Sequence, residues 1–482
     1  METNQRGRAM RLFAYILVAF LVSTCTAPPS VLDQVIKLGE LRVVTLDSPT
    51  TYYLRENGPA GPEFDLVYGL ARKLNVDLNI KTVENPADII PLLLSGEAHM
   101  AAAGIAINDA WQEHINFSYP YTTVDRHLIY KRGTGKPQSI EQVIGRPIEI
   151  INSGSHVQTI EKLSENYPDI RWKYNNHEEV TDLLEKVANN KIDFTIADSH
   201  EFNIHRHYQP ELRIAIQLET NKPLAWAFLK DDDSLKRAAN DYLIDAKRYG
   251  SIKKINDRYY GYTEKFDYVG VREFQKHVEK RLPLYRQHFE SAGQQYGIDW
   301  RLLAAIGYQE SHWKSNAVSR TGVRGIMMLT EATADYLNIK NRRDPESSIF
   351  GGAKFFARQL TRLPEDILEP DRTWFALAAY NVGFNHLKDA RQVLQWQSKD
   401  PDTWLNMTEA LPLLAKRKWY SKLPYGYARG WEPVIYVNNI RSYYNILYWI
   451  TKDEEKENNP LFSRIKIATT EEVLTDPTIL KK

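Results

Sequence analysis

The chain has 482 residues, of which 43% are hydrophobic and 26% are charged, and its formal net charge is +1. This length is more than one ordinary domain needs, so we expect two or three globular domains. A near-neutral charge gives no support to nucleic-acid binding, which depends on a basic surface. Cys25 is the only cysteine, so an internal disulfide is excluded.

Residues 1–25 have the pattern of an export signal, in which arginines precede an apolar run at 12–22 and small residues follow. The run is short for a membrane-spanning helix, which needs about 20 apolar residues, and an uncleaved membrane helix is the alternative. The stretch "LVSTC" resembles a bacterial lipobox with Thr24 in place of the usual Gly, Ala or Ser. Lipidation of Cys25 and ordinary signal cleavage therefore both stay open. Either way we expect the mature chain to face the envelope. We place it in the periplasm, attached to the inner leaflet of the outer membrane, although one acyl chain alone would be a weak anchor.

Residues 31–267 alternate short apolar runs with amphipathic segments. The apolar runs predict strands, and the segments with apolar residues three and four positions apart predict helices. We expect strands at 41–46, 77–83, 98–107, 147–155 and 192–199, and helices at 64–75, 87–97 and 177–190. This alternation predicts an α/β domain with parallel sheets and crossover helices.

From residue 268 onward the strand-like runs end, and aromatic, Leu and Ala residues recur at helical spacings. We expect helices at 285–297, 299–311, 330–339, 352–363 and 373–383. Asp299 and Thr373 fit helix N-caps, and Gly383 fits a C-terminal stop. Residues 268–455 are therefore predicted to form an all-α domain, followed by a charged tail at 456–482.

The sequence predicts neither a metal site nor a cofactor. His200 and His205 are five positions apart, so they miss the four-residue spacing of the helical zinc motif, and His207 brings no further ligand with it. The phosphate-binding pattern of nucleotide enzymes does not occur. We interpret these histidines as solvated surface residues.

Glu310 stands at the end of an apolar helical run, "AIGYQESHW". Leu303, Ile306 and Gly307 precede it by seven, four and three positions and share its helix face. Apolar surroundings raise the pKa of a carboxyl group, and an acid that is still protonated near neutral pH can protonate a glycosidic oxygen. The alternative is a helix-end glutamate paired with an arginine or a backbone group.

Four ordered elements surround this glutamate: Glu310-Ser311, Gly322 to Gly325 running into hydrophobic residues, "AAYNVG" at 378–383, and "YVNNIRSYY" at 436–444. Together they resemble the lytic transglycosylases related to goose-type lysozyme. The resemblance implies peptidoglycan glycan strands as substrate and Glu310 as the acid and base. It also implies a sugar cleft lined by Ser311, Met327, Met328, Tyr380 and Asn381. Met328 stands where most relatives have Gln, so one sugar hydrogen bond is expected to be missing.

No second carboxylate in these elements is placed to activate water. Glu331 fits a dipole-compensating residue in the first turn of the next helix, and the resemblance implies a structural role for Glu432. A lone acid suffices where the 6-hydroxyl of the sugar closes onto C1 and yields 1,6-anhydro-N-acetylmuramic acid, with Tyr380 facing the developing positive charge. A hydrolytic lysozyme on the same fold is the nearest alternative.

Segments of the first domain, among them "LLLSGEAHMAAAGIAI" and "IDFTIADS", resemble the amino-acid-binding periplasmic solute receptors. The resemblance implies two lobes around a ligand cleft. Gly104 to Ala106 would offer backbone groups, Ser155 would begin a helix, and Asp198 would pair with the amine of the ligand. Trp111 replaces the arginine that would bind a free amino acid's carboxylate.

We therefore predict that the first domain prefers a cell-wall peptide or muropeptide as effector. A domain that only docks or spaces is the alternative. The order of the two domains resembles one membrane-associated branch of the lytic transglycosylases. A solute receptor with an inactive helical appendage is a third interpretation.

Overall fold

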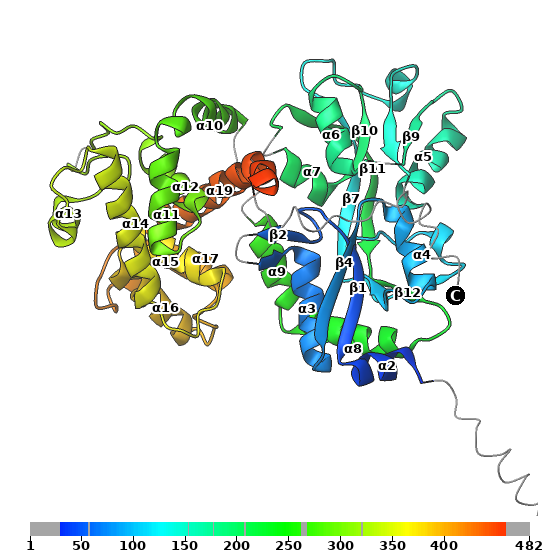
Figure 1. Ribbon diagram of the computed structural model, residues 1–482, viewed down its shortest axis with the longest axis horizontal. Coiled ribbons are helices and arrows are strands. Elements are labelled where there is room, and N and C mark those ends of the chain that lie inside the picture. Colours follow the sequence, from blue (N-terminus) through cyan, green and yellow to red (C-terminus); the bar gives the residue numbers. More distant parts are fainter. Residues whose placement is uncertain are drawn as a thin grey trace, which may run out of the picture.

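A computed structural model of the chain describes residues 29–458, except 56–57, 153, 177, 207–208, 262–267 and 320–321. Figure 1 shows a two-lobed α/β domain beside an all-helical domain. The predicted export signal with Cys25 lies outside the described residues, as does most of the predicted tail. The predicted domain boundary at 267/268 falls at the end of one of the gaps. None of the described helices is both long enough and apolar enough to span a bilayer.

The first lobe is built on a five-stranded sheet with the order β4-β1-β5-β12-β6. Its strands are β1 (Glu40–Leu46), β4 (Asp77–Val83), β5 (Met100–Ala101), β6 (Ile115–Phe117) and β12 (Ala227–Leu229). Strands β4, β1 and β5 are parallel, whereas β12 runs antiparallel to its neighbours β5 and β6. The helices of this lobe are α2 (Val31–Leu38), α3 (Pro62–Leu74), α4 (Ile89–Leu94), α8 (Ser234–Arg248) and α9 (Ser251–Tyr260).

The second lobe contains a three-stranded antiparallel sheet, β10 (Thr195–Asp198), β7 (Thr122–Lys131) and β11 (Leu212–Leu224), in the order β10-β7-β11. A parallel pair, β8 (Glu149–Ile151) and β9 (Lys173–Asn175), lies beside it. The helices are α5 (Gly154–Asn166), α6 (Val180–Ala188) and α7 (Ser199–His205). Strands β7 and β11 run from one lobe into the other and form the hinge (Figure 1).

Three predictions for this domain were wrong. His200 and His205, interpreted as solvated surface residues, are largely enclosed: His205 is buried, and so is Nδ1 of His200. The sheets are mixed or antiparallel as well as parallel, because β12 and β11 return from the second crossing between the lobes. The predicted strand at 98–107 is reduced to Met100–Ala101. Beyond it Gly104 adopts a φ of +64°, a left-handed conformation that interrupts a strand and that glycine adopts without strain.

The second domain is helical, as predicted. It contains α10 (Tyr268–Lys280), α11 (Arg286–Tyr296), α12 (Trp300–Ser311), α13 (Glu331–Leu337), α14 (Pro345–Arg362), α15 (Asp371–Val382), α16 (Phe384–Trp396), α17 (Trp404–Ala410), α18 (Arg417–Tyr420) and α19 (Trp431–Asn458). Asp299 caps α12 by accepting a hydrogen bond from the Arg301 amide, and Gly383 ends α15 with a φ of +89°.

Two details of this domain differ from the prediction. Helix α15 begins at Asp371, so Thr373 lies inside it, where its amide and hydroxyl donate to the Glu369 carboxylate. Helix α19 continues to Asn458, so the predicted tail begins within a helix. A run of charged residues is compatible with a solvated helix, and periodicity alone does not show where such a helix ends.

Helix α19 joins the two domains. The Tyr448 hydroxyl donates to the Leu54 carbonyl of the first lobe, in a hairpin formed by β2 (Tyr53–Arg55) and β3 (Gly58–Ala60). The Arg441 guanidinium donates to the carbonyl oxygens of Asp257 and Arg258 in α9, at 2.8 Å each. The same helix packs along α12, so the first lobe and the Glu310 helix contact one common element.

Candidate active site

Glu310 lies in the last turn of α12, the central helix of the second domain. Leu303, Ile306 and Gly307, the three residues predicted to share its face, are all buried. A side chain at position 307 would meet Ile326 and Met327 at 3.2 Å, so glycine allows the following loop to pack against the helix. Glu310 itself is partly exposed and therefore combines an apolar floor with access from outside.

Tyr436 of α19 donates a hydrogen bond from its hydroxyl to Oε1 of Glu310 at 2.6 Å. Burial nevertheless raises the pKa of Glu310 from 4.5 to about 7, and the Tyr436 hydrogen bond offsets only part of that rise. No cationic side chain of the described residues is among the groups that shift this pKa. The carboxyl group is thus partly protonated near neutral pH and can both donate and accept a proton.

Tyr380 lies beside Glu310, close enough for the Glu310 charge to raise the pKa of the tyrosine further above its ordinary value, after the larger effect of burial. Its hydroxyl donates to the Met327 carbonyl oxygen at 3.0 Å, and its ring packs edge-on against Phe355. The neighbouring Asn381 is exposed at the end of α15. Tyr380 is therefore a neighbour of Glu310, and Asn381 offers an exposed polar group on the same helix as Tyr380.

Ser311 is buried, and its hydroxyl is occupied by backbone groups. The oxygen lies 2.8 Å from the Ile326 carbonyl and 3.1 Å from the Gly307 carbonyl, and it accepts from the Lys314 amide at 3.2 Å. This geometry ties the end of α12 to the loop that follows the glycine pair. Ser311 therefore holds that loop against α12, and its predicted contact with sugar stays a prediction.

Met327 and Met328 face different ways. Met327 is fully buried, so its side chain belongs to the core, and its carbonyl supports Tyr380. Met328 is partly exposed and has a φ of +46°, which is strained for a residue with a side chain. Gly325 makes the turn feasible, since a Cβ there would meet the Arg342 carbonyl at 1.8 Å. Of the two predicted sugar contacts, only Met328 has a side chain with access to the surface.

Two other acidic residues, Glu331 and Glu432, lie at the starts of helices. Glu331 is exposed in the first turn of α13, as predicted, where a negative charge compensates the helix dipole. Glu432 is paired with Arg429 in the first turn of α19. Among the described residues, no second carboxylate shifts the pKa of Glu310, as expected for an acid that acts alone.

The five ligand-site residues predicted in the first domain line one cavity between the lobes. Gly104, Ala106, Trp111, Ser155 and Asp198 all contribute to its wall. The cavity measures ≈ 60 Å³, which leaves room for only a few water molecules. Trp111 approaches the first turn of α5 so closely that a Cβ at position 154 would lie 2.8 Å from its indole nitrogen.

Arg126 of β7, which the sequence did not single out, occupies this inter-lobe site. It donates to both carboxylate oxygens of Asp198 at 2.7 and 2.9 Å. It also donates to the carbonyl and hydroxyl of Ser155 and to the Thr159 hydroxyl. A guanidinium has five N–H groups, and these bonds use all five. Asp198, expected to receive a ligand amine, is thus already paired, and Arg126 has no donor left for a ligand carboxylate.

His156, Asp198 and Glu201 bring possible metal-binding atoms within 4.8 Å of one another. The positive charge at this position is already supplied by Arg126, which lowers the Asp198 pKa to about 2 against the raising effect of burial. Burial raises the pKa of Glu201 to about 8, so this group is mostly protonated at neutral pH and a poor metal ligand. We assign no metal role to the cluster.

Each of the two domains matches a known protein family. Residues 287–403 match the family described as "Transglycosylase SLT domain", and residues 41–262 match "Bacterial extracellular solute-binding proteins, family 3". The helical domain carries an enclosed acid at the end of its central helix, and it is joined to a two-lobed domain that matches the second family. These features define a lytic transglycosylase with a solute-binding-like N-terminal domain.

Relatives match nearly the whole chain. Membrane-bound lytic murein transglycosylase F 1 of Alkalilimnicola ehrlichii is 44% identical over 93% of this chain and 91% of its own length. Membrane-bound lytic murein transglycosylase F of Stutzerimonas stutzeri is 42% identical over 94% of both chains, and that of Pseudomonas fluorescens is 41% identical over 90% of both. The chain therefore belongs to the membrane-bound lytic murein transglycosylase F family. It is a peptidoglycan-cleaving lyase.

Proposed function

We propose that Glu310 acts alone as acid and base in cleaving the β-1,4 bond between N-acetylmuramic acid and N-acetylglucosamine, and that the products carry 1,6-anhydro ends. The observation that carries this proposal is an enclosed carboxyl group with a pKa of about 7 and no second acid beside it among the described residues. Such a group is protonated often enough to donate and ionised often enough to accept a proton.

The first step breaks the bond between C1 and the bridging oxygen. Protonated Glu310 donates its proton to that oxygen, which leaves as the 4-hydroxyl of N-acetylglucosamine. The N-acetyl carbonyl of the muramic acid stabilises the cationic C1, and Tyr380 faces the developing charge. Tyr436 bonds to Oε1 and stabilises the carboxylate that forms.

The second step closes the ring. Ionised Glu310 takes the proton of the 6-hydroxyl, and that oxygen forms a bond to C1. The glutamate returns to its protonated form, and no water is consumed. The two carboxylates of ordinary glycosidases are needed because one of them serves as nucleophile or activates water, and the substrate replaces that group here.

The cleft residues divide into two groups in this proposal. Met328, Tyr380 and Asn381 contact sugar from the rim around Glu310. Ser311 and Met327 act one step away, because Ser311 holds the 325–329 loop and the Met327 carbonyl orients Tyr380. This division refines the sequence-based prediction, which treated all five residues as substrate contacts.

The variant Glu310→Gln tests the assignment. It keeps the shape of the side chain and removes the transferable proton, so muropeptide release from purified sacculi should fall by about 10²–10⁴-fold. Glu331→Gln is the matched control, since Glu331 is an exposed acid at a helix start and should leave release unchanged. Retention of more than about a hundredth of the activity by folded Glu310→Gln would overturn the proposal.

We infer that the first domain is a regulatory sensor of a cell-wall peptide or muropeptide. Helix α19 supports this role because it bears Tyr436, the partner of Glu310, and also contacts the first lobe through Arg441 and Tyr448. Calorimetry with stem peptides, muropeptides and free amino acids side by side tests the preference. Tight binding of a free amino acid that is unaffected by Asp198→Ala would overturn it.

We infer further that the protein is held at the periplasmic face of the outer membrane. The relatives are membrane-bound by name, and the lipobox-like stretch around Cys25 would supply an acyl anchor. Labelling with a radioactive fatty acid and fractionation of the envelope test both points. Cys25→Ala should abolish the label, and a labelled variant or a cytoplasmic location would contradict the inference.

A further inference from the structure

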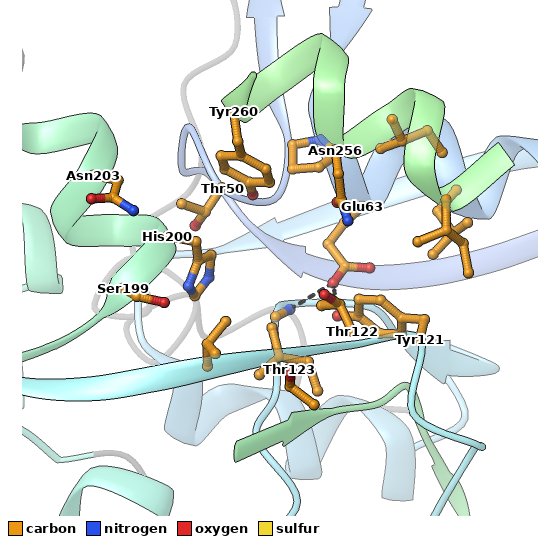
Figure 2. Close-up of a pocket in the computed structure, with 17 residues that line it drawn as sticks. Thr50, Glu63, Tyr121, Thr122, Thr123, Ser199, His200, Asn203, Asn256 and Tyr260 are labelled. Carbon is orange, nitrogen blue, oxygen red and sulfur yellow. Dashed lines mark hydrogen bonds between the residues drawn. The ribbon is translucent and has the colours of Figure 1, made fainter. Parts of the chain in front are cut away.

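A second cavity lies at the hinge of the first domain, on the side that faces α9. It measures ≈ 260 Å³, about four times the volume of the inter-lobe cavity, and is walled by the start of α3, the hinge strand β7, α7 and α9. Figure 2 shows Thr50, Glu63, His200, Asn256 and Tyr260 arranged around this space. The walls therefore come from both lobes and from the helix that contacts the catalytic domain.

Glu63 supplies the only acidic group among the described residues of the cavity wall. Its side chain is 4% exposed, and its oxygens accept from the Gly104 amide at 3.1 Å, from the Trp226 indole at 2.9 Å and from the Tyr121 hydroxyl. A carboxylate has about four acceptor positions, so these donors leave one unused. No Lys or Arg is among the described lining residues, and burial raises the pKa of Glu63. The wall thus holds a carboxyl group whose ionised form lacks a counter-charge.

One nitrogen of His200, another polar group of the wall, lacks a hydrogen-bond partner among the described residues. This atom, Nδ1, is buried. Burial lowers the pKa of this imidazole to about 4, so it is neutral at physiological pH and does not balance Glu63. A buried polar atom without a partner is uncommon and points to a ligand or water that completes it.

The rest of the wall combines aliphatic side chains with hydroxyl and amide groups, and its aliphatic part is formed by Leu66, Val124, Leu224, Ile252 and Ile255. A ligand suited to this lining has a hydrocarbon part and one positive charge. A carboxylate on the ligand would meet Glu63 and no cation. An alcohol would fill the space and leave Glu63 uncompensated.

We propose that this hinge cavity is a second ligand site, separate from the inter-lobe site, and that it binds a small aliphatic primary amine. The ammonium group pairs with Glu63, and the chain packs against Leu66 and Ile255. This second site is separate from the sensor role proposed above. The two are related only because the bound amine would contact both lobes and α9. The second site does not depend on which muropeptide the first domain prefers.

The test is calorimetry on the full-length protein in detergent with n-pentylamine, 1-pentanol and pentanoate. The amine should bind saturably with one site per chain. The alcohol should bind roughly 10–100-fold more weakly, because it cannot form the charge-assisted hydrogen bond. Pentanoate should not bind. Equal affinities of the three probes, or no saturable binding of the amine, would overturn the proposal.

Four variants, two of them controls, assign the binding to the cavity. Glu63→Gln should reduce the affinity for the amine to that for the alcohol, whereas the exposed acid in Glu97→Gln, paired with Lys81, is the matched control and should change nothing. Asn256→Trp fills the cavity without touching the bonds of Glu63, so it should abolish binding of amine and alcohol even if Glu63→Gln folds poorly. Trp111→Ala, in the inter-lobe site, should leave amine binding intact.

Two outcomes would show that the site lies elsewhere. One is amine binding that survives Asn256→Trp, and the other is amine binding that disappears in Trp111→Ala alone. None of these measurements reads murein cleavage, so their failure is distinct from a failure of the proposed catalytic role.

Discussion

Glu310 in the helical domain and Asp198 in the α/β domain are both enclosed carboxyl groups at helix ends, and their surroundings shift their pKa values in opposite directions. Burial raises the pKa of each. At Glu310 only a tyrosine hydroxyl opposes this effect, and the pKa reaches about 7. At Asp198 a bidentate Arg126 reverses it, and the pKa falls to about 2. The presence of a guanidinium therefore separates a carboxyl group that can exchange protons from one that holds a lobe together.

The position of each carboxyl group on its helix acts in the same direction as the net shift of its pKa. Glu310 lies at the C-terminal end of α12, where the helix dipole disfavours a negative charge. Asp198 is the N-cap of α7, where backbone amides favour one, and its own amide donates to the Glu201 carboxyl group in a capping box. The difference between Glu310 and Asp198 leads us to expect separate effects of substitutions on stability and on activity.

The largest expected effect is on the paired acid. Arg126→Met removes the counter-charge and leaves Asp198 buried and unpaired, so the free energy of unfolding of the first domain should fall by about 3–5 kcal/mol. Combining Arg126→Met with Asp198→Leu should restore most of this stability, because no buried charge remains. Calorimetric unfolding of the full chain measures both. An unchanged transition for Arg126→Met alone would show that the pair does not stabilise the lobe.

Glu310→Gln should raise the free energy of unfolding, whereas Arg126→Met should lower it. The folded-state pKa of about 7 lies above the ordinary value of 4.5, so the wild type loses stability as pH rises between these values. Glutamine removes that dependence, and the variant should exceed the wild type by about 1–3 kcal/mol above pH 7 and by almost nothing near pH 4. Unfolding across this pH range is the measurement. A difference between variant and wild type that is independent of pH would contradict the raised pKa.

Tyr436→Phe tests how the hydrogen bond to Glu310 sets the pH dependence of the rate. The wild-type rate should fall as pH rises through about 7, because the general acid loses its proton. Without the Tyr436 hydroxyl the ionised form loses its hydrogen bond, so this limb should move to higher pH and the maximal rate should drop about tenfold. Tyr380→Phe is the control, since Tyr380 bonds to Met327 and should leave the limb in place. A limb that moves in Tyr380→Phe and stays in Tyr436→Phe would reverse the two roles.

The smallest effect is expected from separating the domains. Residues 268–458 contain Glu310, Tyr380 and Tyr436, and they should cleave peptidoglycan within a few-fold of the full chain. Such a fragment lacks the hydrogen bonds from Arg441 and Tyr448 to the first lobe, but it keeps the bond from Tyr436 to Glu310. Muropeptide release per mole of folded fragment measures this. A folded fragment without activity would mean that the first lobe completes the site.

Local sequence patterns predicted the features that depend on helical periodicity. The buried face of α12, its Asp299 cap and the Gly383 stop all follow from spacing and residue type within about a dozen positions. The Thr373 cap was wrong because α15 begins two residues earlier, at Asp371, after Pro370 and without a side-chain cap.

The decisive partners of both carboxyl groups could not be found in this way. Tyr436 is 126 residues from Glu310, and Arg126 is 72 residues from Asp198. Tyr436 did lie in one of the four motif elements, so its place opposite the glutamate could have been suspected. Arg126 carries no local signal, because a strand arginine is ordinarily exposed. Its full burial follows only from the way the sheet of the second lobe packs on α5.

The central claim is that one acid suffices because the substrate supplies the nucleophile. Mass analysis of muropeptides released in water enriched in oxygen-18 tests it most directly. If the 6-hydroxyl of the sugar attacks C1, the released muropeptides should carry 1,6-anhydro ends that contain no heavy oxygen. Reducing ends that carry oxygen-18 would mean that water attacks C1, and they would contradict the central claim.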